Sequence, residues 1–248
     1  MKFLFHILLL LLSISTIAQN SKRIEILNTD NTYANANIHP DYWRLIGNVS
    51  FKHNDAIMTC DSAYHYNAEN KMEAFGEIKI NQGDSITLTG EMLTYFGKEN
   101  KADIKGNVVL IDKHMTLNTE QVFYNLSTNI ASYPSKGTII DNEKTINSKR
   151  GAYHSNIHKF IFKDSVVVLA KDYKILTDNM HYNSNSEVTY FFGPSFIISD
   201  TKTIYCENGW YNTKTDIAQF RENSYITTDN YLLKGDSLYY NKNKQYGK

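Results

Sequence analysis

The sequence lacks several features that identify common classes of protein. It has no excess charge of either sign, because 26 Lys and Arg residues balance 26 Asp and Glu residues scattered singly along the 248-residue chain. Nucleic-acid-binding proteins carry a basic patch, so no nucleic-acid partner is expected, and purely electrostatic attachment to a membrane surface is disfavoured. No stretch has a 3.6-residue apolar period, which argues against amphipathic helices.

Motifs for catalysis or metal binding are also absent. The sequence has no CxxC, HExxH or GxSxG motif and no phosphate-binding loop. The nearest pair of dispersed histidines, His154 and His158, flanks a Ser-Asn-Ile turn, where solvated histidines are a more common outcome than a zinc site. We therefore expect neither an enzyme nor a bound metal or cofactor.

A membrane-spanning helix is not expected either. The longest apolar run extends from Phe3 to Leu12 and is interrupted by His6, whereas a spanning helix needs roughly 20 apolar residues. Lys2 precedes this run, and small and polar residues follow it, with Thr16 and Ala18 suitably placed before a cleavage site. These features predict that residues 1–18 are a secretory signal peptide and that the mature chain is exported.

The residues that are abundant favour β-strands. The chain has 18 tyrosines and 12 phenylalanines but only three prolines, and Ile, Thr and Tyr dominate its short apolar runs. Tyrosines recur every 29 residues, at Tyr66, Tyr95, Tyr124, Tyr153, Tyr182, Tyr211 and Tyr240. This period indicates stacked repeats, each too small to bury its apolar face alone.

Two further columns of residues follow the same 29-residue period. Seven residues before the tyrosines stand Thr59, Leu88, Leu117, Ile146, Ile175, Ile204 and Leu233. Nine residues after them stand Phe75, Ile104, Tyr133, Phe162, Phe191 and Phe220. Period-two alternation places such columns on one face of a sheet, so about seven repeats should stack their apolar residues into continuous stripes.

The repeated polar residues are expected to have structural roles. Gly47, Gly76, Gly106, Gly137 and Gly193 are expected to open successive units. The carboxylates four residues before the tyrosines (Glu91, Glu120, Asp178, Glu207 and Asp236) should face solvent or bond turn amides, and the asparagines that follow the tyrosines should begin turns. Residues 19–46 are predicted to be a degenerate capping repeat and residues 47–248 the repeat domain.

The two cysteines are expected to be unpaired. Cys60 and Cys206 lie 146 residues apart, about five repeats, which separates them by roughly 24 Å even with one strand per repeat. A disulfide requires Cα atoms within about 7 Å.

Several stretches resemble the OstA-like family, the lipopolysaccharide-transport domains typified by LptA and the N-terminal part of LptD. The likeness rests on the stretches Gly47-Asn48-Val49-Ser50-Phe51, Cys60-Asp61-Ser62-Ala63-Tyr64, Gly106-Asn107-Val108-Val109-Leu110 and Gly209-Trp210-Tyr211-Asn212. The resemblance implies an all-β antiparallel β-jellyroll, or β-taco, that carries lipopolysaccharide across the periplasm with its lipid A acyl chains in an apolar groove. It also implies other Lpt-type jellyroll domains as partners, and association with the inner or outer membrane through them.

On this interpretation the apolar columns line the lipid groove. The expected lining residues are Val49, Phe51, Ile78, Ile80, Leu88, Leu117, Ile146, Ile175, Ile204, Leu233, Phe75, Phe162, Phe191 and Phe220. The tyrosine column permits two interpretations, core packing with each hydroxyl at a wet edge or contact with a ligand in the groove. The C-terminal strand, which has no covering segment, is expected to pair head to tail with another jellyroll domain or a second copy.

Two other functions compete with lipid transport. A structural or adhesive β-solenoid would have a closed, dry core and act through its surface. A carbohydrate-active β-helix enzyme is the weakest alternative, because an active site would break the repeat pattern at one place. The cross-section distinguishes the lipid carrier from the adhesive solenoid, since a carrier keeps an apolar groove open and an adhesin fills it.

Overall fold

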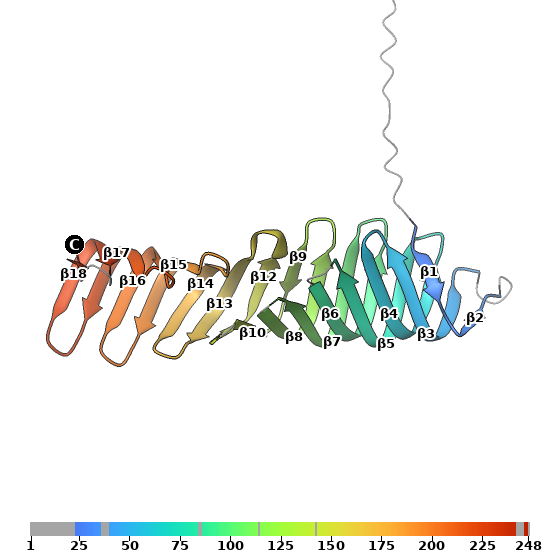
Figure 1. The fold of residues 1–248 in the computed structure, drawn as a ribbon, viewed down its shortest axis with the longest axis horizontal. Helices are drawn as coiled ribbons and strands as arrows, with labels where there is room; N and C mark the ends of the chain where they lie inside the picture. The colour runs from blue at the N-terminus through green and yellow to red at the C-terminus, as the bar shows by residue number, and fades with distance from the viewer. Residues whose placement is uncertain are drawn as a thin grey trace, which may run out of the picture.

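The computed structural model of the chain describes residues 23–35, 40–83, 86–113, 115–141, 143–241 and 246–247. The predicted signal peptide lies outside these residues. The described chain forms one rod of antiparallel strands, with β2 (Asn31–Tyr33) near one end and β18 (Leu232–Asn241) at the other (Figure 1). The all-β antiparallel repeat fold expected from the sequence is therefore confirmed. In these residues no helix is long and apolar enough to span a membrane.

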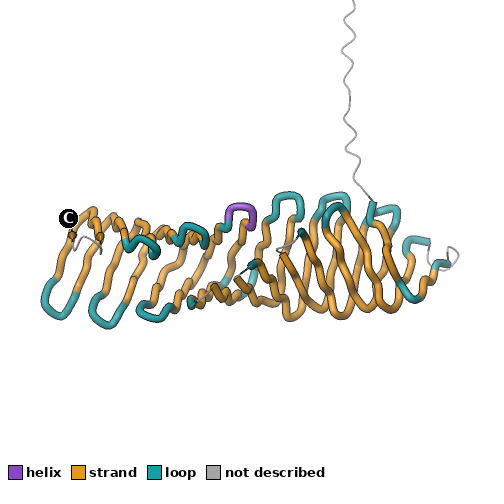
Figure 2. Tube along the Cα trace, viewed as in Figure 1, coloured by secondary structure: helices purple, strands orange, loops and turns teal. Residues whose placement is uncertain are grey.

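The remaining strands follow one another along the rod, with a single 3-10 turn, η1, near its middle (Figure 2). They are β1 (Glu25–Asn28), β3 (Trp43–His53), β4 (Ala56–Tyr66), β5 (Lys71–Gln82), β6 (Ile86–Phe96), β7 (Lys101–Asp112), β8 (Met115–Asn125), β9 (Ile130–Tyr133), β10 (Gly137–Asp141), β11 (Lys144–Ser148), β12 (Arg150–His154), η1 (Ser155–Ile157), β13 (Lys159–Leu169), β14 (Lys174–Asn183), β15 (Val188–Ile198), β16 (Thr203–Asn212), β17 (Ile217–Thr227) and β19 (Tyr246–Gly247).

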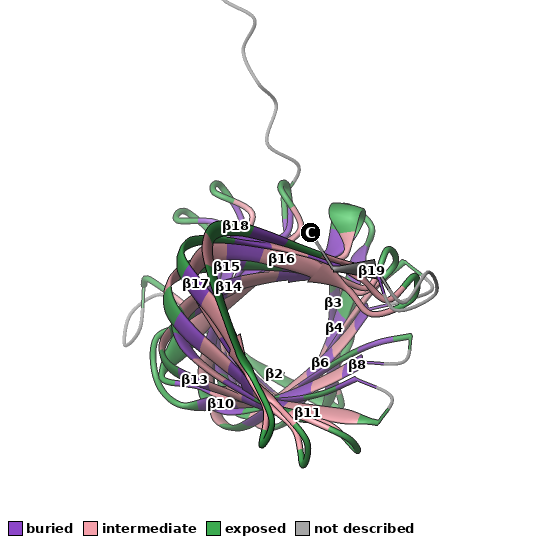
Figure 3. Ribbon diagram, turned by 90° about the vertical axis from the view of Figure 1, so that its left-hand side faces the viewer, coloured by how far each residue is buried: buried purple, intermediate pink, exposed green. Residues whose placement is uncertain are grey.

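Each repeat contributes two strands, which tight hairpins and longer loops join alternately. β4 ends at Tyr66, residues 67–70 form a loop, and β5 returns to the hairpin that leads into β6. A bend in the middle divides these strands into two halves. We call the halves beside the hairpins (in β4, residues 56–60) the hairpin arm and the halves beside the loops (residues 62–66) the loop arm. Seen along the rod, the two arms surround a common axis (Figure 3).

The bend is a β-bulge built from two residues in the left-handed conformation. In β7 the pairing with β8 shifts between Lys105 and Val108, where Gly106 and Asn107 have φ angles of 82° and 46°. Glycine adopts this conformation freely and asparagine tolerates it. The expectation that the glycines open repeat units is thus wrong for Gly47, Gly76, Gly106 and Gly193, which lie inside strands at the bend.

Carboxylates of the predicted column support these bends. Glu91 accepts a hydrogen bond of 2.6 Å from the Asn107 side-chain amide, and Glu207 accepts one of 3.0 Å from Asn223. Asp178 accepts the backbone N–H of Ser165, another bend residue, at 3.0 Å. These acids thus bond groups of the bulges inside the strands at the three positions, where turn amides were expected.

The asparagines that follow the tyrosines do begin turns. Asn125 accepts backbone N–H groups from Ser127 and Thr128 at 3.0 and 3.1 Å, and Asn212 does the same for Lys214 and Thr215 at 3.0 Å each. Such short side-chain bonds to the backbone hold the loops in a fixed shape. Successive loops therefore present equivalent positions along the rod.

The inner faces of both arms form one apolar core along the described rod. Alternate residues are buried, as in β8, where Met115, Leu117, Val122 and Tyr124 are at most 4% exposed. This is the period-two pattern of strands with one face in a core. The rod is thus held together by its interior, which the apolar columns build.

Phe75 departs from this pattern and corrects one expected lining residue. Its side chain is 38% exposed on the outer face of β5, whereas neighbouring Ala74 is fully buried. Three residues separate Gln82 from Ile86, but only two separate His53 from Ala56 in the equivalent hairpin. A slip of one residue moves a side chain to the opposite face of a sheet.

The same slip affects the first tyrosine of the column. Equivalent positions on either side of the longer hairpin lie 30 residues apart, so His65, at 5% exposure, occupies the inner position that Tyr95 fills in the next repeat. Tyr66 instead lies on the outer side, where its hydroxyl donates to Glu73 at 3.1 Å. The strict 29-residue column therefore begins at Tyr95.

Short strands cover one end of the rod, and the other end is largely open. β1 and β2 both pair with β3, and the boundary drawn at Gly47 falls inside β3. At the opposite end β18 pairs with β17 along its length, whereas β19 pairs only with Tyr240 and Asn241. Among the described strands, residues 232–239 of β18 thus have a neighbour on one side only.

Both cysteines are free and buried, as expected. Burial raises the pKa of each thiol to about 12, so both thiols stay protonated and shielded in the folded protein at neutral pH. We expect no reaction with a water-soluble thiol reagent at pH 8 in the native state and two thiols per chain after unfolding without reductant. Titration with such a reagent checks this, and a monomer without titratable thiols would contradict it.

Candidate functional site

Most of the expected lining residues lie in the core. Twelve of the fourteen are at most 5% exposed, and these are Val49, Phe51, Ile78, Ile80, Leu88, Leu117, Ile146, Ile175, Ile204, Phe162, Phe191 and Phe220. Leu233 is 43% exposed because it lies in β18, the terminal strand. Leu233 and Phe75 are thus the two expected lining residues that do not lie in the interior.

The tyrosines do more than pack in the core, because four of them close the cross-section. The hydroxyl of Tyr95, at the tip of the loop arm, forms a 2.6 Å hydrogen bond with His53 Nδ1 at the tip of the hairpin arm. Tyr124 donates to Gln82 Oε1 at 2.6 Å, and Tyr182 is hydrogen-bonded to Asp141. We call these cross-arm bonds clasps.

The fourth clasp joins Tyr153 to Asp112 in the middle of the rod. The Tyr153 hydroxyl donates to Asp112 Oδ2 at 2.6 Å, and both side chains are buried. Burial, followed by this bond to a carboxylate, raises the pKa of Tyr153 far above its ordinary value. The phenol therefore remains a donor at all physiological pH values, and the clasp stays formed.

The clasps stop where the column of acceptors runs out. One repeat beyond Asp141 the equivalent residue is Ala170, which has no side-chain acceptor, and the next is Ser199. Tyr211 instead donates to Asp216 of its own loop at 2.8 Å, and the Tyr240 hydroxyl accepts from Lys202 Nζ at 3.4 Å. We call β3–β13, whose last clasp reaches Tyr182 at the loop end of β14, the clasped section, and β14–β18 the open section.

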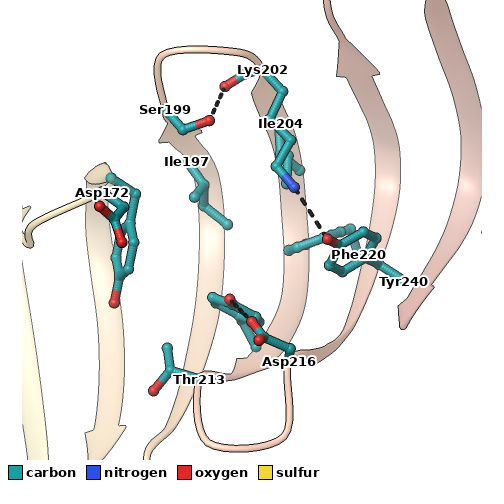
Figure 4. Close-up of a pocket in the computed structure, with 11 residues that line it drawn as sticks. Asp172, Ile197, Ser199, Lys202, Ile204, Thr213, Asp216, Phe220 and Tyr240 are labelled. Carbon is teal, nitrogen blue, oxygen red and sulfur yellow. Dashed lines mark hydrogen bonds between the residues drawn. The ribbon is translucent and has the colours of Figure 1, made fainter. Parts of the chain in front are cut away.

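A cavity of about 380 Å³ lies in the open section, between the tips of the two arms. Ile197, Ile204 and Phe220 form its apolar floor, as Figure 4 shows. Its rim is polar and is formed by Asp172, Tyr173, Ser199, Lys202, Tyr211, Thr213, Asp216 and Tyr240. The site is therefore an apolar trough with a hydrogen-bonding rim, a shape suited to an amphipathic ligand.

The rim carries charges of both signs. Burial and then the nearby carboxylates of Glu187 and Asp216 raise the pKa of Tyr173 to about 12. The Lys202 ammonium lies 4.5 Å from the centre of the Tyr240 ring, a cation–π arrangement that holds the lysine at the rim. Tyr173 thus acts as a neutral hydrogen-bonding group, and Tyr240 presents its apolar ring face to the lysine.

A stack of aromatic rings fills the core where the two sections meet. Phe160 lies 4.3 Å from Tyr153, 5.6 Å from Phe162 and 6.2 Å from Tyr182, measured between ring centroids, and all three pairs are stacked. Aromatic packing of this kind adds about 0.5–1.5 kcal/mol per pair to the effect of burial. The stack joins β12, β13 and β14 through their inner faces.

Removing the Tyr153 hydroxyl should destabilise the protein. In Tyr153→Phe the Asp112 carboxyl loses its donor. Its other oxygen, Oδ1, already has no hydrogen-bond partner among the described residues. We expect the free energy of unfolding to fall by about 2–3 kcal/mol. Tyr211→Phe is the matched control, because Asp216 lies at the partly exposed rim and can bond water, so we expect less than about 1 kcal/mol. Urea unfolding of both variants measures the difference, and equal losses would contradict the role of the clasp.

Clasps and rim residues were not identified from the sequence as a site. The acceptors His53, Gln82, Asp112 and Asp141 recur at 29- or 30-residue spacing, so a column of hydrogen-bonding side chains was available as a signal. Because the four acceptors are different residue types, the column is not recognisable as a repeated motif. In the described part of the chain no three His, Cys, Asp or Glu side chains converge to hold a metal ion.

The sequence model of the OstA-like protein family matches residues 21–178 and 171–236. The solved structure of LptH from Pseudomonas aeruginosa, described as the LptA-homologous periplasmic component of a lipopolysaccharide transport device, is 13% identical, with a TM-score of 0.43. That match covers 47% of this chain and 94% of LptH. No curated protein sequence matches. Because the family match extends over most of the sequence, the chain belongs to the family of OstA-like proteins.

Proposed function

We propose that this protein binds lipopolysaccharide in the periplasm and passes it toward the outer membrane, holding lipid A acyl chains in the trough of the open section. The chain acts as a binding and bridging protein and catalyses no reaction. Membership of the OstA-like family supports this role.

One observation carries the proposal: the apolar interior opens to solvent where the clasps end. The cavity floor of Ile197, Ile204 and Phe220 continues the buried columns of the clasped section. Each methylene group of an acyl chain transferred from water into such a trough contributes about 0.8 kcal/mol. The polar rim stays available for the head group.

A structural or adhesive solenoid is the second candidate. It is favoured by the clasped section, where core side chains and the tyrosine clasps fill and close the cross-section. A protein of this kind would bind no lipid and would act through its outer faces. Lipid binding by the purified protein therefore separates the two functions.

Binding of a fluorescent fatty-acyl probe provides the test. The full-length mature protein should bind the probe saturably, and intact lipopolysaccharide should displace it. The lipid-free saccharide of lipopolysaccharide should not displace it, because only acyl chains enter the trough. Absence of saturable probe binding would contradict the carrier function and favour the solenoid.

The open edge of β18 is the proposed contact for other Lpt-type jellyroll domains or for a second copy. Unpaired N–H and C=O groups on an edge strand are templates for pairing with another strand. Residues 232–239 have no second neighbour among the described strands, and Tyr240 of the same strand lines the trough. Head-to-tail pairing would extend the trough into the next molecule.

Proline in β18 should suppress this association. We expect the wild-type protein to form head-to-tail oligomers whose mass rises with concentration, and Leu238→Pro, which removes a backbone donor, to stay monomeric. Leu238 is itself buried, so Leu232→Pro, at a position 56% exposed, is the variant that leaves the core intact. Sedimentation measures the masses, and strictly monomeric wild-type protein at high concentration would contradict the contact.

A further inference from the structure

The outer face of the loop arm carries an unusual row of side chains in β13–β18. Residues paired directly across these six strands form one row, which consists of Ile161, His181, Tyr190, Trp210, Gln219 and Tyr239. Tyr190 is 44% exposed and Tyr239 is 37% exposed, and Phe192, beside the row, is 39% exposed. We call this surface the aromatic platform.

The two rows that flank the platform contain polar and apolar side chains but no acidic group. The row on the bend side consists of Phe192, Asn208, Arg221 and Ser237, and the row on the loop side of Lys159, Asn183, Val188, Asn212, Ile217 and Asn241. No Asp or Glu occurs in the three rows. The Arg221 guanidinium donates to Gln219 at 2.8 Å, which places its charge next to the platform.

The charged side chains within the three rows, Lys159 and Arg221, are both cationic. Burial lowers the pKa of His181, and the positive charges of Lys159 and Lys163 lower it further. The corresponding row of the clasped section differs, because Glu73 pairs with Tyr64, and Asp103 pairs with Phe123. The aromatic platform of β13–β18 is therefore the part of this outer face that suits an anionic ligand.

The platform is continuous with the proposed lipid site. Trp210 and Tyr239 face outward, while the next residues on the same strands, Tyr211 and Tyr240, line the cavity. A molecule with acyl chains in the trough can therefore reach the platform by passing over the tip of the loop arm.

We propose that the aromatic platform binds the anionic saccharide of the glycolipid whose acyl chains occupy the trough, an inference that rests on the proposed function. Pyranose rings present apolar C–H faces that pack on aromatic rings, and their hydroxyl groups bond amides such as Gln219 and Asn208. Phosphate or carboxylate groups on the saccharide pair with Arg221 and Lys159. Exposed aromatic surface of this kind marks an interaction site.

Tryptophan fluorescence provides a direct test. The chain has two tryptophans, so Trp43→Phe leaves Trp210 as the reporter in the platform. Lipid-free saccharide released from lipopolysaccharide should change the Trp210 emission saturably. Tyr190→Ser combined with Tyr239→Ser should weaken this binding about tenfold and leave fatty-acyl probe binding unchanged.

Phe123→Ser combined with Phe96→Ser is the matched control, because these outer-face aromatics of the clasped section are 45% and 38% exposed. It should leave the saccharide affinity unchanged. If the saccharide does not bind while the acyl probe does, the platform proposal is overturned and the carrier function stands. If Tyr190 and Tyr239 prove necessary only for binding a jellyroll domain, the platform is a protein contact and the proposal is likewise overturned.

Discussion

Leu117→Asp should prevent the protein from folding, or reduce its free energy of unfolding by at least about 4 kcal/mol. Leu117 is 1% exposed and lies between Leu110 and Ile139 on the neighbouring strands. A carboxylate there loses its hydration and gains no partner, since the surrounding side chains are apolar. Ile175→Asp, at the same position two repeats later and 2% exposed, should have a similar effect.

Ile140→Asp is the matched control for this prediction. Ile140 is 46% exposed on the outer face of β10, next to buried Ile139. The same substitution there keeps its carboxylate in water and should change the free energy of unfolding by less than about 1 kcal/mol. Chemical denaturation followed by circular dichroism measures all three variants, and a stable Leu117→Asp protein would show that the inner face is assigned wrongly.

Ile204→Trp should abolish binding of the fatty-acyl probe while the protein stays folded. Ile204 forms part of the cavity floor, and the larger indole can occupy the cavity of about 380 Å³ that would otherwise receive acyl chains. Losing even four methylene contacts would weaken binding more than a hundredfold, by about 3 kcal/mol. Fluorescence titration of the variant measures this loss.

Leu88→Trp is the control in the clasped section, because Leu88 occupies the equivalent inner position and is fully buried. It has no cavity to fill, so overpacking should destabilise the fold by about 1–3 kcal/mol and leave probe binding intact. Equal probe affinity in Ile204→Trp and wild-type protein would exclude the trough as the acyl site.

Amino-acid composition was enough to predict the strands, and the repeat period was enough to predict the apolar columns and the unpaired cysteines. These features follow from local alternation of buried and exposed residues, which the sequence records directly. The 29-residue period did not reveal that the hairpin before Ile86 is one residue longer. The columns after this insertion keep the 29-residue spacing, so they give no sign of it. Phe75 and Tyr66 were assigned to the wrong face for that reason.

The clasps could not be predicted from the same columns. Tyr124 meets Gln82 across 42 residues, and Tyr153 meets Asp112 across 41, so each bond depends on how the bend brings the two arm tips together. The sequence also gives Ala170 no special weight, although the missing acceptor there marks the start of the open section. The position of the trough is thus a consequence of three-dimensional closure.

Photo-crosslinking in living cells tests the central claim, that the open section carries lipopolysaccharide acyl chains, most directly. A photoreactive amino acid at Ile197, in the cavity floor, should yield an adduct that contains lipopolysaccharide. The same residue at Ile139, buried in the clasped section, and at Ile140, on the outer face, should yield none. Absence of a lipid adduct at Ile197, or an equal yield at Ile140, would contradict the account.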